Sequence, residues 1–234
     1  MPVGIMINLL AVVIGGLIGS LVKDRMPQTL KDSLNMIFGL SSMGMGIASI
    51  VLMQNMPAVI FSLIAGTCFG LMIHLGDKIT ALAGKMQKLM GMENSGNSAQ
   101  LVTVMVLFCA SGTGIYGSLV SGMNGDHSIL IAKSILDLFT AMIFACALGK
   151  TVSLIAVPQA VVMLGLFFLA GVIVPLTTSE MINDFKACGG FIMVATGFRI
   201  LQLKQFPTAD MIPAMILVMP LSWLWVTYIL PLVG

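Results

Sequence analysis

Charged residues are scarce in this sequence. Only 9% of the 234 residues are Asp, Glu, Lys or Arg, whereas a soluble globular domain carries about 25%. Apolar residues make up 58% of the chain, and the mean hydropathy is +1.07. These values exclude a soluble enzyme and a disordered chain, and the net charge of +2 is too small for a nucleic-acid binder. We therefore predict a polytopic membrane protein.

Motifs for catalysis and metal binding are missing as well. The four cysteines form no CxxC pair, which argues against a disulfide framework and against a zinc site. The sequence contains no GxSxG, HExxH or Walker A pattern, and its GxGxxG match at 112–117 lies inside an apolar run and follows no strand. We predict no enzymatic activity, no metal and no cofactor.

Long apolar runs dominate what is present. A helix needs about 20 apolar residues to span the bilayer core, and we predict an all-α protein with about eight such spans. The predicted spans are Ile5–Val22, Ser33–Met53, Ala58–Leu75, Leu101–Val120, Ile129–Leu148, Val152–Val174, Asn183–Leu201 and Met211–Val233.

The distribution of basic residues predicts the orientation of these spans. If the N-terminus is outside, the inner segments contain nine of the eleven Lys and Arg residues, and the outer connections contain none. With eight spans the C-terminus is then outside too. We therefore predict a bacterial inner-membrane protein with both termini in the periplasm.

Counting the spans also predicts an internal duplication. The first three-helix unit (1–75) and the second (101–175) run in opposite directions if the linker 76–100 is cytoplasmic. This is the arrangement of inverted-repeat transporters. Residues 176–234 form a two-helix extension within the same single transmembrane domain.

Small and polar residues form a stripe along the second predicted span. Asn35, Gly39, Ser42, Gly46 and Ser49 recur at helical spacing and share one face. Small residues allow helices to approach closely in lipid, so tight packing is one explanation of the stripe. A polar pathway, with Asn35 as one of its ligands, is the other.

The fifth span carries the strongest functional signal. Lys133, Asp137 and Thr140 share one helical face, and Asp137 lies about 12 Å below the start of the span, near the bilayer midplane. A carboxylate at that depth must face a partner, the bundle interior or water. The pair is therefore either part of a substrate or ion pathway, or a structural ion pair.

Glycine-rich stretches indicate that some helices are interrupted and leave open which of three spans these are. Gly15-Gly16 lies in the first span, Ser111-Gly112-Thr113-Gly114 in the fourth and Gly189-Gly190 in the seventh. Interrupted helices expose backbone groups that can bind a solute or ion, although glycine also occurs in closely packed continuous helices.

Four segments together resemble the YqgA/YdfK-type family of bacterial inner-membrane proteins. They are Leu107–Ile115, Gly125–Ala145, Pro175–Thr178 and Ala195–Ile200. The resemblance extends over nearly the whole chain. It implies a multi-pass inner-membrane protein with a transporter-like role, and it implies no particular substrate.

The leading hypothesis is a secondary transporter or permease for a small polar solute or ion, coupled to H⁺ or Na⁺. The predicted pathway residues are Asp137, Lys133, Ser134, Thr140, Ser111, Thr113 and Asn35. A channel, or a non-transporting component that binds a partner or forms a structural oligomer, remains the alternative. The predicted partners are the lipid bilayer and the solute. A homodimer is compatible with the GxxxG spacings at Gly15/Gly19 and Gly66/Gly70, which equally suit packing within one subunit.

Overall fold

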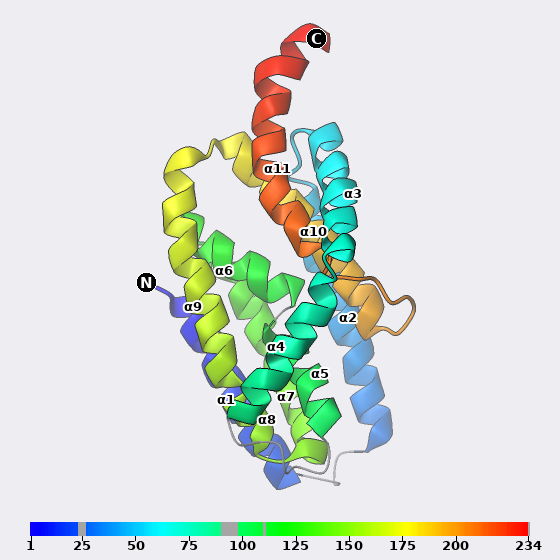
Figure 1. Ribbon diagram of the computed structural model, residues 1–234. Coiled ribbons are helices and arrows are strands. Elements are labelled where there is room, and N and C mark those ends of the chain that lie inside the picture. The colour runs from blue at the N-terminus through cyan, green and yellow to red at the C-terminus, as the bar shows by residue number, and fades with distance from the viewer. Residues whose placement is uncertain (23–26, 90–97, 110, 234) are drawn as a thin grey trace. The chain divides into compact units, whose positions relative to one another are not determined.

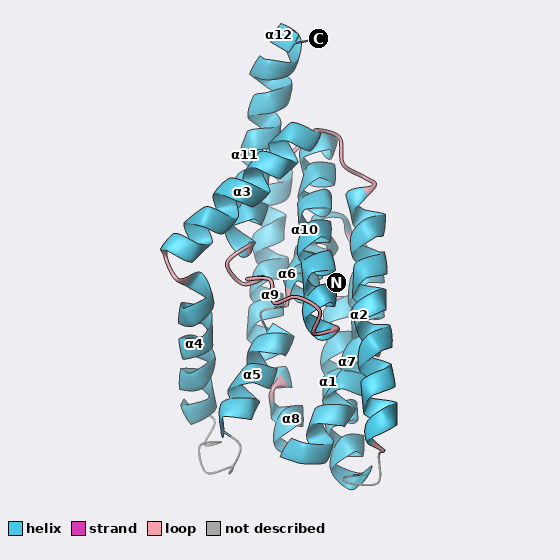
Figure 2. Cartoon of the chain, turned by 90° about the vertical axis from the view of Figure 1, so that its right-hand side faces the viewer, coloured by secondary structure: helices cyan, strands magenta, loops and turns pink. Residues whose placement is uncertain are grey.

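The computed structural model describes residues 1–22, 27–89, 98–109 and 111–233, and within these ranges the chain consists of helices and loops without a strand (Figure 2). The helices are α1 (Val3–Val22), α2 (Gln28–Ile50), α3 (Met56–Met72), α4 (Leu75–Leu89), α5 (Ser98–Cys109), α6 (Gly112–Asn124), α7 (Ser128–Leu148), α8 (Thr151–Leu154), α9 (Ala156–Ile173), α10 (Ser179–Ile200), α11 (Ile212–Leu224) and α12 (Leu230–Val233). A 3₁₀ turn (Val174–Leu176) follows α9, and a π-helical turn (Trp225–Ile229) joins α11 to α12.

Five stretches of helix in the described residues are long and apolar enough to cross a membrane. They are α1, α2, α7, α8 with α9, and α11 with its extension to Leu232. A sixth is added if α3 and α4, which meet at a bend of 57°, form one broken span. The eight predicted spans therefore exceed what helix length and composition show. Two reasons are that α5 and α6 are short, with 12 and 13 residues, and that α10 contains Glu180, Asp184, Lys186 and Arg199.

The three glycine-rich stretches differ in their effect on the helices. The fourth predicted span is broken, because α5 ends at Cys109 and α6 begins at Gly112. Both α1 and α10 are continuous, so Gly15-Gly16 and Gly189-Gly190 do not interrupt their helices. There the missing side chains admit a neighbouring helix, and the backbone stays helical.

The chain forms two compact units. Unit 1 comprises residues 1–38 and 77–171, and unit 2 comprises residues 39–76 and 172–234. The predicted linker 76–100 contains most of α4, while its residues 90–97 and the basic residues Lys23 and Arg25 lie outside the described part of the chain. The division into two inverted three-helix units stays a prediction.

Unit 1 is built on the parallel pair α1 and α7 (Figure 1). A Cβ on Gly15 would collide with the carbonyl oxygen of Leu138, and a Cβ on Gly19 with that of Met142. Only glycine therefore permits the two backbones to approach this closely. An apolar cluster of side chains from α1, α5, α7 and the α8–α9 segment lies beside this contact; it includes Val12, Leu101, Val104, Met105, Phe108, Ala141, Ala145, Val152 and Ile155.

Unit 2 contains two antiparallel helix pairs. In the first, Gly39 and Gly46 of α2 meet Gly197 and Gly190 of α10, and the hydroxyl of Ser42 donates to the Met193 carbonyl oxygen at 2.9 Å. The stripe on α2 thus serves tight packing along Gly39, Ser42 and Gly46.

In the second pair, Gly66 and Gly70 of α3 lie against Ala214 and Asp210, at and just before the start of α11. Both GxxxG spacings, this one and Gly15/Gly19, are therefore used within the chain. The homodimer stays a prediction.

Candidate functional site

Lys133 and Asp137 form a buried ion pair on α7. The Lys133 Nζ lies 2.5 Å from Asp137 Oδ2, one helical turn along the same face. The two residues are 3% and 7% exposed, so neither side chain reaches the surface of unit 1. The predicted spacing therefore produces direct pairing within the helix rather than two separately oriented charges.

Asn8 of α1 and Gln159 of α9 surround this pair with hydrogen bonds. Asn8 Nδ2 donates to Asp137 Oδ2 at 2.9 Å, and Gln159 Nε2 donates to Asn8 Oδ1 at 2.8 Å. Gln159 Nε2 also lies 3.4 Å from Asp137 Oδ2. Both amide side chains are completely buried. The N-terminal helix α1 and the later helices α7 and α9 thus build one polar group, here called the Asp137 cluster (Asn8, Lys133, Asp137 and Gln159).

A completely buried oxygen atom of this cluster lacks a hydrogen-bond partner. The side-chain oxygen Oε1 of Gln159 is buried and accepts no hydrogen bond. Buried polar atoms in folded proteins are almost always paired, so an unpaired acceptor marks either strain or a position where a ligand or water belongs.

The broken helix α5–α6 borders the cluster at Lys133. The Phe108 ring near the end of α5 has its centroid 5.8 Å from Lys133 Nζ, a cation–π distance. In the first turn of α6, a Cβ on Gly114 would lie 3.0 Å from Lys133 Cε, so glycine leaves room for the lysine chain. Ser111 caps this helix, because its Oγ accepts from the Gly114 N–H at 3.1 Å.

The remaining predicted residues lie outside the hydrogen bonds of the Asp137 cluster. Ser134 donates to the Leu130 carbonyl oxygen within α7, at 2.6 Å. Thr113 is buried in the first turn of α6, while Thr140 and Asn35 are half-buried on α7 and α2. Their assignment to a pathway stays a prediction.

Two cluster residues, Asn8 and Gln159, are absent from the predicted set. Each is a polar amide inside an apolar run, and that is a visible signal because such residues are costly in a membrane. The sequence contains many other intramembrane polar residues, however, and only the packing of α1 and α9 against α7 singles out these two.

A second buried carboxylate, Asp184 of α10, lies in unit 2. Its Oδ1 accepts from the backbone N–H groups of Gln54 and Asn55 at 2.8 and 2.9 Å. Its Oδ2 accepts from Asn55 Nδ2 at 2.9 Å and from the Ser222 hydroxyl at 2.6 Å. Because Asn55 is the N-cap of α3, the carboxylate also faces the positive end of that helix. Asp184 therefore ties the start of α3 to α10 and α11.

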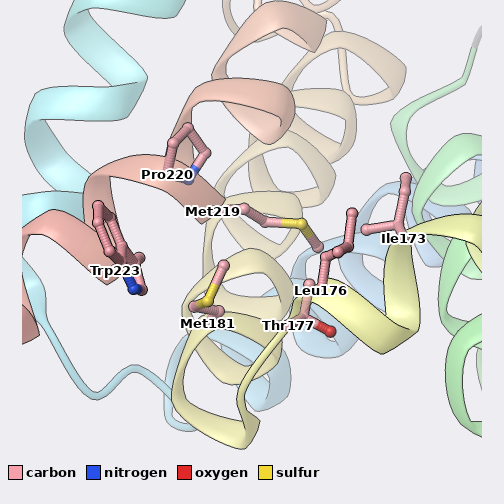
Figure 3. A pocket seen from close by; sticks show the side chains of 7 residues that line it. All are labelled: Ile173, Leu176, Thr177, Met181, Met219, Pro220 and Trp223. Carbon is pink, nitrogen blue, oxygen red and sulfur yellow. The ribbon is translucent and has the colours of Figure 1, made fainter.

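Unit 2 also contains a hollow of about 340 Å³ (Figure 3). It is lined by Ile173, Leu176, Thr177, Met181, Met219, Pro220 and Trp223. The lining is mainly apolar and contains no ionisable side chain. This hollow therefore has no charged group comparable to Lys133 or Asp137 of unit 1.

Comparison with known proteins identifies the family. A model of the family described as "Protein of unknown function (DUF554)" matches residues 3–223. The chain belongs to this family. The Escherichia coli (strain K12) protein named "Uncharacterized protein YqgA" is 43% identical over 233 residues, covering 97% of this chain and 99% of the relative. No solved structure matches.

A more distant relative is named as a membrane protein. The Bacillus subtilis (strain 168) "Uncharacterized membrane protein YdfK" is 24% identical over 220 residues, covering 92% of this chain and 93% of the relative. The resemblance predicted from four segments is thereby confirmed. Together with the apolar helices, this relative supports a membrane location for the chain.

Proposed function

We propose that the protein is a secondary transporter that moves a small polar solute or ion across the bacterial inner membrane, coupled to H⁺ or Na⁺. The observation that carries this proposal is the Asp137 cluster. It places a charged pair and two amides at the buried meeting point of α1, α7 and α9. Ionisable residues inside a membrane bundle are costly and mark substrate or proton pathways by default.

The residues have distinct proposed roles. Asp137 is the coupling carboxylate or a direct ligand. Lys133 tunes the protonation of Asp137 or meets an anionic group of the substrate. The break before Gly112 supplies the irregular backbone that transporters place at their binding sites. Ser111, Thr113, Ser134, Thr140 and Asn35 are proposed as neutral ligands in a conformation that opens the pathway.

The proposed topology has eight spans, with α5–α6 as the broken fourth span and α10 as the seventh. Eight alternating spans require α1 and α7 to run in the same direction, and α2 and α10, and also α3 and α11, in opposite directions, whichever side of the membrane the N-terminus lies on. The glycine contacts within each unit have these directions, which supports the proposal. The inverted repeat of two three-helix units is proposed on the same basis.

A non-transporting membrane component is the second candidate. It is favoured by the direct pairing within the protein, since Asp137 Oδ2 receives hydrogen bonds from both Lys133 and Asn8. Such a pair can simply determine how α1 and α7 pack.

Ligand-dependent thermal stability distinguishes these two functions. Purified wild type and an Asp137→Asn variant are heated with sugars, amino acids, organic acids, nucleobases and cations, and any hit is then tested for uptake into proteoliposomes. A ligand at 100 times its Kd adds about 2.7 kcal/mol of stability. The Ser62→Ala variant is the matched control, because Ser62 is buried in unit 2 and its hydroxyl donates to the Ala58 carbonyl oxygen within α3.

We expect a hit that stabilises wild type and Ser62→Ala but not Asp137→Asn. Full transport of an identified substrate by folded Asp137→Asn and Lys133→Ala variants would contradict the site assignment. A wild type that responds to no compound and transports none contradicts the transporter and supports the second candidate.

A further inference from the structure

The orientation of the two amides in the Asp137 cluster is dictated by hydrogen-bond chemistry. The carboxylate Oδ2 of Asp137 is an acceptor, so Asn8 must turn Nδ2 toward it. Asn8 Oδ1 then faces Gln159 and requires a donor, which Gln159 Nε2 provides at 2.8 Å. Rotating the Gln159 amide by 180° would place its oxygen against two other acceptors, Asn8 Oδ1 and Asp137 Oδ2.

This chain of bonds ends at an acceptor that has no donor. Gln159 Oε1 is directed away from Asn8 and Asp137, and it is both buried and unpaired. A group that completes the network must therefore donate at this point. An N–H of a solute satisfies that requirement, and an ammonium satisfies it best because its hydrogen bonds are charge-assisted.

Lys133 supplies the donors of the cluster. The Lys133 ammonium has three N–H groups and uses one of them on Asp137. Lys133 also lies against the first turn of α6, a 13-residue helix whose N-terminus carries positive partial charge. Both features favour an anionic oxygen, and a helix N-terminus beside an unwound segment is a recurring carboxylate site in transporters.

Charge balance selects between ligand classes. The Lys133–Asp137 pair is neutral as a whole, so a ligand with a net charge would leave an uncompensated charge in the membrane interior. Lys133 Nζ and Gln159 Nε2 both lie against the same oxygen of Asp137, at 2.5 and 3.4 Å, so the lysine that offers donors and the amide that carries the unpaired oxygen belong to one small cluster.

We propose that the Asp137 cluster binds a small zwitterion of the α-amino-acid type. Its ammonium donates to Gln159 Oε1, and its carboxylate accepts from Lys133 and the first turn of α6. The assignment rests on the proposed transport function, which it deepens by naming the substrate class.

A series of blocked ligands tests the assignment. Thermal stability is measured with glycine, alanine and serine, and then with N-acetylglycine, which lacks the ammonium, and glycinamide, which lacks the carboxylate. We expect at least one free amino acid to stabilise wild type and Ser62→Ala in a saturable manner. Either blocked ligand should bind at least ten-fold more weakly, and so should the free amino acid to a Gln159→Met variant.

The outcomes separate this assignment from the transport function. If no zwitterion stabilises wild type, or if blocked and free ligands bind equally, the assignment is overturned. A sugar or inorganic ion whose effect depends on Asp137 would overturn it while leaving transport in place. An amino acid that binds as expected but does not enter proteoliposomes overturns transport and leaves the binding site. The wild-type ligand series decides the question, so the test stays valid even if the Gln159→Met variant does not fold.

Discussion

Asn8 and Asp137 lie 129 positions apart in the chain, and a buried hydrogen bond of 2.9 Å joins their side chains. This bond links α1 to α7 at the level of the ion pair. It also determines the direction in which the Gln159 amide points, because Asn8 can offer only its oxygen to α9 once its nitrogen faces the carboxylate.

Replacing Asn8 with Leu should destabilise the protein by about 1–3 kcal/mol, because Asp137 loses a donor and Gln159 an acceptor, both in a buried position. Thermal unfolding of the detergent-purified protein, followed by tryptophan fluorescence, measures the change. Ser62→Ala is the control and should stay within about 1 kcal/mol. Equal stabilities of Asn8→Leu and wild type would show that the bond is dispensable.

Removing the Lys133 ammonium alone should lower the free energy of unfolding more than removing both members of the ion pair. Lys133→Met leaves Asp137 as an uncompensated buried charge, for which about 3–5 kcal/mol is typical. The double variant Lys133→Met with Asp137→Leu should regain most of this loss, since no isolated charge remains. A double-mutant cycle measures the coupling, and strictly additive effects would contradict it.

Asp184 should behave as a structural carboxylate. Asp184→Ala leaves four donors from Gln54, Asn55 and Ser222 without their acceptor, and we expect a loss of about 3 kcal/mol or more. Adding Ser222→Ala to the Asp184→Ala variant should lower stability little further, because the Ser222 hydroxyl has already lost its partner, the Asp184 carboxylate. Ligand binding at Asp137, measured in whatever fraction folds, should be unchanged.

Substitution of glycine by alanine should lower stability at closely packed positions and leave it unchanged or raise it at open ones. In Gly70→Ala the new Cβ would collide with the carbonyl oxygen of Asp210, so α3 and the start of α11 must separate and stability falls. Gly84→Ala in α4 meets nothing within 4 Å and should be neutral or stabilising by about 0.5–1 kcal/mol, the usual helix-interior preference for alanine. Equal effects at the two sites would refute the close packing of α3.

The proposed orientation predicts which loops a membrane-impermeant thiol reagent reaches. Single cysteines at Asp126 and Glu180, in a chain whose four native cysteines are replaced by Ala, should react from outside intact cells. A cysteine at Lys78 in α4 should react only after the cells are opened. The reverse pattern would invert the proposed topology.

Part of the candidate site could be predicted from spacing alone. Lys133 and Asp137 are four residues apart in a strongly apolar run, and helical geometry places such residues on one face. Ser111 likewise precedes a glycine-rich stretch and proves to be the cap of α6. These are local relationships, and local sequence determines them.

The number of membrane spans could not be predicted from composition alone. Apolar runs predicted eight spans, yet the described helices give five or six, because α5 ends at Cys109, α6 begins at Gly112, and α10 contains four charged residues. The glycines of α1 and α10 resemble those of the broken segment in sequence. Whether such a glycine interrupts a helix or admits a neighbour depends on what packs against it, which the local sequence does not contain.

The sequence by itself determined that the chain is a helical membrane protein and that a lysine and an aspartate share a face of α7, because both follow from hydropathy and the helical repeat. Only the tertiary structure decided that Asn8 and Gln159 join that pair and that Asp184 caps α3. Such bonds connect helices more than a hundred residues apart, and the choice among many polar side chains depends on which faces meet when the helices pack.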